Sequence, residues 1–194
     1  VDNTVISLDA ATQVYNSNIV EAIAPAALMA HWTFDEGSGT VLNDFSGNDF
    51  NGTLGDGSAT WGGGMPTWTT DRYGNEGGAL MFDKGAHVTI PYNAAINPQT
   101  LTISVWLNAA EILENNRFMG LHSWNGFKFQ LQSANKPFFT VATSDGIWDR
   151  DTDPGLDIET WYHVVVSLGG GNMTFYVNGT EAQVWDNCPG TAVA

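Results

Sequence analysis

One segment of the chain carries aspartates at alternate positions, an arrangement in which carboxylates can gather around a cation. It runs Asp149-Arg150-Asp151-Thr152-Asp153-Pro154-Gly155-Leu156-Asp157. Carboxylates at its first, third, fifth and ninth positions resemble the calcium-binding loop of an EF-hand. The segment therefore predicts a structural calcium ion, Ca²⁺, with Asp149, Asp151 and Asp153 as ligands.

This acidic segment departs from the EF-hand pattern in ways that leave an alternative open. Pro154 stands where the sharp turn uses glycine, Thr160 replaces the bidentate glutamate, and flanking helices are not expected. The alternative is a solvated acidic loop that Arg150 partly neutralises. Both interpretations place the segment in a long loop, Asp145–Glu159.

A second oxygen-rich segment lies earlier in the chain, where Asp44, Ser46 and Asn48 alternate on a glycine-containing loop. Calcium takes six to eight oxygen ligands at about 2.3–2.6 Å, and a short acidic loop can supply them without a helix. Asp44 and Asn48 are therefore further candidate metal ligands. The alternative is an Asx-turn, in which the Asp44 carboxylate binds the backbone of its own loop.

Aromatic residues beside amides and carboxylates indicate a different chemistry, the binding of sugars. Sugars are commonly held by stacking on an aromatic ring together with hydrogen bonds from planar polar groups. We predict that Trp124 and Asn125 form one part of such a site and that Asp145 and Trp148 form another. The alternative is that these aromatic side chains lie under the rim of the fold as part of its core.

The intervening residues predict the strands that position these segments. Hydrophobic residues recur with a period of two, most clearly in Leu101–Asn108, which places Leu101, Ile103, Val105 and Leu107 on one buried face. Asn178-Gly179 predicts a tight hairpin, because both turn positions tolerate positive φ. The predicted strands are His31–Phe34, Ala79–Phe82, His87–Ile90, Leu101–Asn108, Phe127–Leu131, Phe138–Thr143, Trp161–Leu168, Met173–Val177 and Thr180–Trp185.

Residues 1–29 differ from the rest of the chain, being poorer in aromatic side chains. They predict a short strand over Thr4–Leu8 and a short helix over Ala10–Ala24, and we expect them to form an N-terminal extension or linker. Residues 30–194 predict an all-β, two-sheet antiparallel sandwich. A second long loop is expected over Asp35–Glu76.

The overall charge of the chain limits the partners it can bind. Six lysine and arginine residues stand against 21 acidic residues, which gives a net charge of −15. This composition argues against nucleic acid as a partner, because phosphate binding needs clustered basic side chains. No apolar run reaches the roughly 18 residues that membrane insertion needs. The single cysteine, Cys188, excludes an intrachain disulfide.

The order of several segments resembles the laminin-G-like domains of the concanavalin A-like lectin/glucanase superfamily, from about Ala30 onward. The resemblance implies a jelly-roll sandwich and a structural calcium ion near Asp44. The segments that carry it are His31–Thr40, Asp44–Asp49, Asn51–Leu54, Gly77–Asp83, Val88–Pro91, Leu101–Leu107, Thr160–Val165 and Phe175–Thr180.

The resemblance leaves the function open, because this fold serves lectins, adhesins, enzymes and spacers alike. Glucanase relatives carry a Glu-x-Asp-x-x-Glu strand, and the nearest spacing here, Asp157-Ile158-Glu159, lacks the third carboxylate. Gly-x-Ser-x-Gly, metalloprotease and phosphate-loop motifs are also missing from the sequence. His163 is expected to make a structural hydrogen bond and Cys188 to be an ordinary thiol. We therefore expect no enzymatic activity.

These observations predict a non-catalytic, extracellular or cell-surface module for binding or adhesion. Its expected partner is carbohydrate or another surface molecule, such as a glycoconjugate. The alternative is a structural protomer of a surface layer or extracellular filament, which self-assembles by strand donation.

Relatives close the sandwich with a final segment resembling Gly-x-Ile-Asp-Asp-Val-Arg-Ile-Tyr, which the sequence up to Ala194 does not contain. The domain is therefore expected to lack its closing strand. Unpaired backbone groups would then lie beside His31–Phe34, and leaving them buried would be unfavourable. We expect residues 1–29, a C-terminal extension or a neighbouring protomer to pair with that segment.

Overall fold

The computed structural model describes residues 4–7, 28–55, 64–83, 85–112, 116–121 and 126–188. The chain forms two compact units, Val1–Tyr92 and Asn93–Ala194. Within the described residues the helical structure is limited to the 3-10 turn η5, Ala94–Ile96. In the same part of the chain, no helix is both long and apolar enough to cross a membrane. The predicted all-β fold is confirmed, whereas the predicted boundary between residues 29 and 30 stays a prediction.

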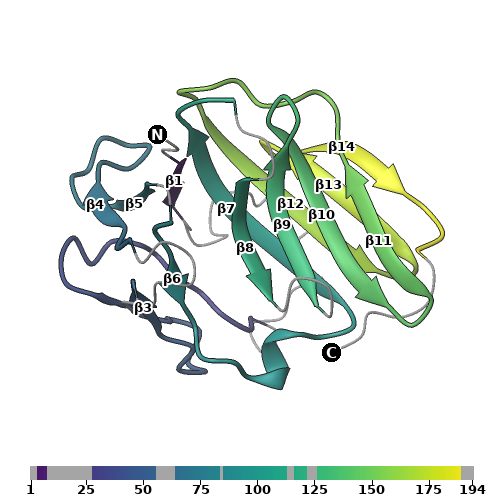
Figure 1. Cartoon of the computed structure of the whole chain (residues 1–194), viewed down its shortest axis with the longest axis horizontal. Coiled ribbons are helices and arrows are strands. Elements are labelled where there is room, and N and C mark those ends of the chain that lie inside the picture. The colour runs from purple at the N-terminus through teal and green to yellow at the C-terminus, as the bar shows by residue number, and fades with distance from the viewer. Residues whose placement is uncertain are drawn as a thin grey trace. The chain divides into compact units, whose positions relative to one another are not determined.

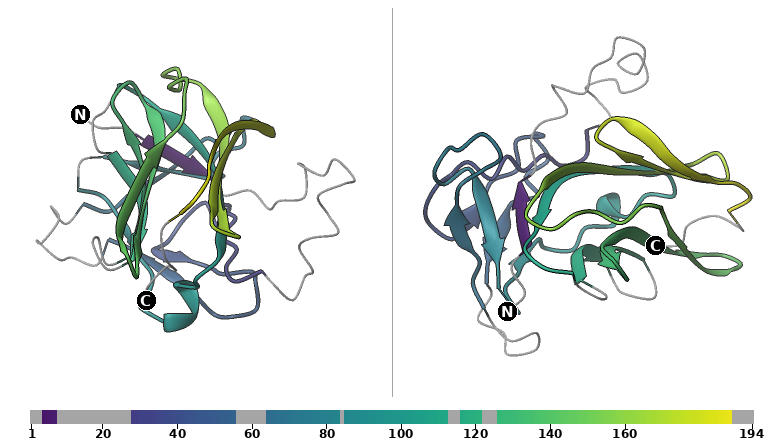
Figure 2. Two further views of the ribbon diagram at one scale, coloured as in Figure 1. Left: turned by 90° about the vertical axis from the view of Figure 1, so that its right-hand side faces the viewer. Right: turned by 90° about the horizontal axis from the view of Figure 1, so that it is seen from above.

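The strands of the C-terminal unit form two antiparallel sheets. One has the order β7-β12-β13-β14 and the other has the order β8-β9-β10-β11 (Figure 1). In side view the two sheets lie as separate layers, so the predicted sandwich is confirmed (Figure 2). The strands are β7 (Leu101–Ala109), β8 (Asn116–Leu121), β9 (Phe127–Gln132), β10 (Lys136–Thr143), β11 (Gly146–Asp151), β12 (Trp161–Gly169), β13 (Asn172–Val177) and β14 (Thr180–Trp185).

Side chains from alternating strand positions fill the core of this sandwich. Of the four core positions predicted in β7, Val105 and Leu107 are buried, and the two nearer its start are half-buried. In the other sheet, Phe129 and Phe139 are fully buried and their rings meet edge to face, 5.7 Å between centroids. β11 and β14 are the outermost strands of their sheets.

The predicted hairpin at the end of the chain is confirmed. Asn178 and Gly179 join β13 to β14 with φ values of 50° and 78°. These positive values match the tight turn whose twist suits a two-stranded ribbon. The Asn178 side chain also accepts a hydrogen bond from the backbone N–H of His163, 2.9 Å away, which ties the turn to β12. The hairpin thereby fixes the place of Trp185, the last residue of β14.

The N-terminal unit contains two groups of short antiparallel strands. In one, β3 pairs with β2 and β6, and in the other, β5 pairs with β1 and β4. The strand predicted over Thr4–Leu8 is present, and the helix predicted over Ala10–Ala24 lies outside the described residues. The strands are β1 (Thr4–Ser7), β2 (Val41–Leu42), β3 (Gly52–Leu54), β4 (Thr67–Thr69), β5 (Ala79–Phe82) and β6 (Val88–Thr89).

The strand predicted over His31–Phe34 was wrong. Trp32 forms only a single antiparallel bridge, with Asp44. Phe34 has a φ of 59°, a left-handed conformation that a strand does not accommodate. The carbonyl oxygen of His31 accepts a hydrogen bond from the backbone N–H of Phe45 at 2.8 Å. The partner of this segment therefore comes from the Asp44 loop of the same unit, and β1 pairs with β5 instead.

Both predicted long loops contain strands. Residues 35–76 include β2, β3 and β4, and residues 145–159 include β11. The charged residues Asp149, Arg150 and Asp151 obscured β11, because a run of charges is more typical of a loop. The strand forms because all six of its residues pair with β10 and because Trp148, only 4% exposed, anchors it in the core.

Candidate functional site

The Asp44 carboxylate lies at the centre of a hydrogen-bonded loop. Its Oδ1 accepts the backbone N–H groups of His31 at 2.8 Å and Ser46 at 2.9 Å. Its Oδ2 accepts the Ser46 hydroxyl at 2.7 Å and the Phe50 N–H at 3.0 Å. The Asn48 amide nitrogen donates to the carbonyl oxygen of Met29 at 2.9 Å. Four donors occupy the acceptor positions of the Asp44 carboxylate, which favours the Asx-turn interpretation.

Burial alone would raise the pKa of Asp44, but hydrogen bonds from His31, Ser46 and Phe50 outweigh it and lower the pKa below its ordinary value. The sign follows from the donors, which stabilise the ionised carboxylate. A lowered pKa in the folded state adds stability above the unfolded-state pKa, and this stability is lost as the pH falls through the folded-state value.

We expect Asp44→Ala to lower the free energy of unfolding by about 2 kcal/mol at pH 7, because backbone donors lose their partner. The difference from the unaltered protein should begin to shrink as the pH falls below about 4, the ordinary pKa of aspartate, and should be lost once the pH falls through the lower folded-state pKa. Urea unfolding at pH 7 and pH 3 measures both effects. Asp83→Ala, at an exposed carboxylate of the same unit, is the control. Equal stabilities at pH 7 would contradict the proposed role of Asp44.

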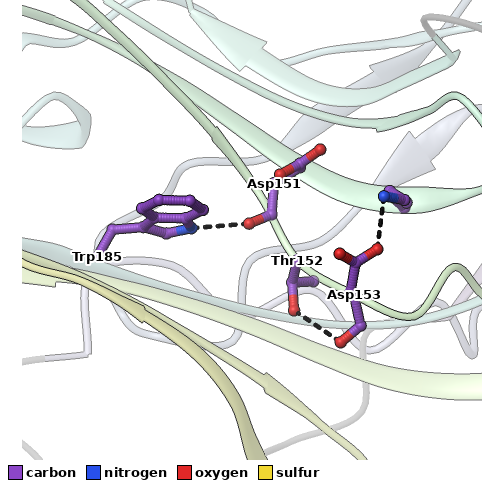
Figure 3. Close-up of polar contacts among 5 residues, drawn as sticks. Asp151, Thr152, Asp153 and Trp185 are labelled. Carbon is purple, nitrogen blue, oxygen red and sulfur yellow. Dashed lines mark hydrogen bonds and ion pairs between the residues drawn. The ribbon is translucent and has the colours of Figure 1, made fainter.

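The three aspartates predicted to line a calcium loop do not lie in one loop. Asp149 and Asp151 belong to β11, and Asp153 follows it. The Asp149 carboxylate accepts the Thr140 hydroxyl at 2.5 Å. Asp153 forms an ion pair with Lys136 at 2.5 Å, drawn as a dashed line in Figure 3. The loop geometry behind the EF-hand comparison is therefore corrected, because pairing with β10 extends the first part of the segment.

The predicted calcium ion needs several oxygen ligands gathered around one point. Across the part of the chain that the structure describes, no three His, Cys, Asp or Glu side chains gather closely enough to hold one. The Asp44 carboxylate accepts four hydrogen bonds, and the backbone at Asp149 is extended by its pairing with β10. Calcium binding stays a prediction, and a shift of the melting temperature with a chelator or added Ca²⁺ would decide it.

Side chains cover the outer backbone of β11. The carbonyl oxygen of Asp149 accepts Arg150 Nη1 at 2.6 Å. The carbonyl oxygen of Asp151 accepts Trp185 Nε1 at 2.8 Å (Figure 3). The Arg150 guanidinium lies over two indole rings, 4.7 Å from the centroid of Trp148 and 5.2 Å from that of Trp185. These cation–π contacts and hydrogen bonds join the edge of one sheet to the edge of the other.

A pocket of about 240 Å³ opens at this junction of β11 and β14. Its lining combines aromatic, acidic and cationic side chains, namely Phe138, Asp149, Arg150, Asp151 and Trp185. Asp149 is exposed, and the other four are half-buried. Phe138 lies directly opposite Asp151 in the pairing of β10 with β11. The pocket thus offers aromatic surface beside carboxylate oxygens that can accept hydrogen bonds.

A row of polar side chains crosses the sheet behind Asp149. Lys128 of β9, Thr140 of β10 and Asp149 are consecutive cross-strand neighbours. Burial lowers the pKa of Lys128, while the charge of Asp149 acts in the opposite direction. Lys128, Thr140 and Asp149 therefore form one polar row on the same face of the sheet.

The predicted sugar-binding residues do not come together in the structure. Trp124 and Asn125 lie outside the described residues. Trp148 is 4% exposed, so its indole belongs to the core and offers no open face for stacking. Asp145 lies in the turn from β10 to β11, at the opposite end of β11 from Asp151.

Sequence reasoning missed Phe138 and Trp185 as pocket residues. Both were placed correctly in predicted strands, but their proximity to Asp151 depends on strand pairing and on the edges of two different sheets. The position of Trp185 at the open end of the Asn178-Gly179 hairpin was the available signal. An aromatic residue that ends an outer strand is well placed to contact a ligand at the rim.

The expectation for His163 agrees with its surroundings. Its Nε2 lies 2.7 Å from the Ser104 hydroxyl oxygen, and its ring lies 5.2 Å from that of Trp106. Its side chain is only 4% exposed. These contacts are those of a buried side chain that joins β12 to β7.

Cys188 is expected to react slowly with alkylating reagents. Burial raises the pKa of its thiol, although the charge of Arg150 partly opposes this effect. Because the thiolate is the nucleophile, a higher pKa lowers the fraction of Cys188 that is present as thiolate at pH 8. We expect alkylation by iodoacetamide to be several-fold slower in the folded protein than in urea. Equal or faster alkylation of the folded protein would contradict this assignment.

The paired sheets define a β-sandwich with a pocket where the edge strands β11 and β14 meet. The family model described as the Concanavalin A-like lectin/glucanases superfamily, a laminin G model, matches residues 82–191. This match covers more than half of the chain, and the chain belongs to this family. The segments before residue 82 that contributed to the resemblance lie outside the match.

Curated proteins and solved structures show less similarity to the chain than the family model does. No curated protein matches the chain. Among solved structures, 48% of this chain is similar to a Bacteroides ovatus protein described as a candidate carbohydrate-binding protein, with 19% sequence identity and a TM-score of 0.40. The similar region spans 28% of that protein.

Proposed function

We propose that the chain is a non-catalytic carbohydrate-binding module and that the pocket between β11 and β14 is its binding site. The observation that carries the proposal is the placement of Trp185 beside Asp149 and Asp151 in one solvent-open pocket. An indole ring can pack against the apolar C–H face of a sugar, and carboxylates accept hydrogen bonds from its hydroxyls. Membership of a lectin/glucanase superfamily is consistent with this chemistry.

The proposal of binding without catalysis rests on the arrangement of the carboxylates. Glycoside hydrolysis uses two carboxyl groups on either side of the scissile bond, one of which is protonated. In the pocket, Asp149 and Asp151 alternate on one strand. The Glu-x-Asp-x-x-Glu spacing of glucanases is missing from the sequence. Placement outside the cell or at its surface is part of the same proposal, since glycans are abundant there.

Titration calorimetry with a panel of oligosaccharides tests the proposed function. We expect at least one oligosaccharide to bind and none to be cleaved during prolonged incubation, as measured by the release of reducing ends. If the panel contains no ligand, the binding proposal fails. If a saccharide is cleaved, the chain is an enzyme and the non-catalytic assignment fails.

A further inference from the structure

The residues that line the pocket carry two carboxylates and one guanidinium, and Lys128 lies two strands away from Asp149 on the same sheet. Asp149 and Asp151 both line the pocket, and both belong to β11, the outermost strand of its sheet. Asp153, the next aspartate along the chain, forms an ion pair with Lys136 at 2.5 Å, so the charge of Lys136 is already paired with a carboxylate. The chain as a whole carries a net charge of −15. A ligand entering the pocket therefore meets a negative potential, which repels anions and is screened by salt.

Arg150 is the cation among the residues that line the pocket, and part of its guanidinium is already engaged. Nη1 donates to the carbonyl oxygen of Asp149 at 2.6 Å. Its plane packs over the rings of Trp148 and Trp185. Nε is buried and has no hydrogen-bond partner among the described residues. Recognition of a carboxylate or sulfate uses two parallel N–H donors of a guanidinium, and here Nη1 is bonded to a backbone carbonyl and Nε is buried.

We infer that the pocket takes an uncharged saccharide and discriminates against uronic acids and sulfated sugars; this inference rests on the proposed function of the same site. The two aspartates accept hydrogen bonds from ligand hydroxyl groups, which neutral sugars supply in neighbouring pairs. Trp185 and Phe138 supply the apolar surface. A ligand carboxylate or sulfate brings a negative charge and additional acceptors to a pocket that needs donors.

The test uses sugars that differ only at the sixth carbon. Oligomers of galactose are compared with oligomers of galacturonic acid, and oligomers of glucose with those of glucuronic acid, by titration calorimetry at pH 7. For the series that binds, we expect the uronic acid form to be at least about tenfold weaker. The gap should narrow as the salt concentration rises from 20 to about 500 mM, because salt screens the repulsion.

Single charge-neutralising variants locate the source of the discrimination. Asp149→Asn and Asp151→Asn keep an acceptor oxygen and remove one negative charge, so each should narrow the gap between neutral and uronic acid ligands several-fold. Glu181→Gln removes the same charge from an exposed position elsewhere on β14 and should leave the gap unchanged. Circular dichroism and melting temperatures confirm that each variant is folded.

The possible outcomes separate this inference from the proposed function. Uronic acid oligomers that bind as tightly as the neutral ones, or more tightly, overturn the inference and leave carbohydrate binding intact. A gap that Glu181→Gln narrows as much as Asp149→Asn also overturns it, because the charge of the whole chain would then be responsible. If neither class of saccharide binds, both the proposed function and the inference are overturned.

Discussion

Replacing Gly155 by alanine is expected to lower the free energy of unfolding by about 3 kcal/mol or more. A Cβ atom at this position would lie 1.8 Å from the carbonyl oxygen of Ala134 and 2.9 Å from its carbonyl carbon. Both are backbone atoms, so no side-chain rotation can relieve the overlap. The next residue is also tied to this turn, because the backbone N–H of Leu156 donates to the Asn135 carbonyl oxygen at 3.0 Å.

Gly169→Ala is the matched control for this substitution. A Cβ atom there would meet only the Thr100 side chain, at an ordinary contact distance of 3.9 Å. Its effect on stability should therefore be small. Urea unfolding followed by circular dichroism compares the two variants with the unaltered protein. If Gly155→Ala is as stable as Gly169→Ala, the close approach of the segment after β11 to the β9–β10 turn is wrong.

The second large effect is expected at Trp185. Trp185→Ala should weaken saccharide binding at least about a hundredfold, because the substitution removes both the stacking surface and the hydrogen bond to Asp151. Trp185→Phe keeps an aromatic ring and loses the indole N–H. We expect it to retain much more of the affinity than the alanine variant.

The comparison between these two variants separates the contribution of the aromatic ring from that of the indole hydrogen bond. Both lack the 2.8 Å hydrogen bond from the indole Nε1 to the Asp151 carbonyl oxygen. A similar loss of binding in the two variants would assign the effect to that bond and not to the ring. Undiminished binding by Trp185→Ala would remove the pocket from the proposed site. Circular dichroism of each variant checks that the fold is unchanged.

Local sequence patterns predicted most strands of the sandwich. Alternation in Leu101–Asn108 requires only that one face is buried, and the observed strand ends one residue later. The hairpin was predictable because Asn178 and Gly179 have an intrinsic preference for positive φ. These patterns depend only on residues that are close in the sequence, so contacts between distant residues did not alter the structures that they predict.

The features missed in the sequence depend on contacts between distant residues. The charged end of β11 becomes a strand because β10 offers a continuous partner. The segment around Asp44 could be identified as oxygen-rich from the sequence. Only folding brings the backbone N–H groups of His31 and Phe50 to the Asp44 carboxylate. Both Trp185 and Trp148 lie in strands, and their different burial, half-buried against buried, likewise follows from strand order.

The capped edge of β11 has a consequence for how this protein can change. An outer strand with free carbonyl groups is a template on which another chain can add a strand, and Arg150 and Trp185 occupy two of those groups. The same Trp185 also faces the pocket. A substitution of Trp185 that changes ligand preference would therefore also expose the Asp151 carbonyl group, to which another chain could add a strand. Divergence of specificity should proceed through Phe138 and the aspartates before it reaches the tryptophan.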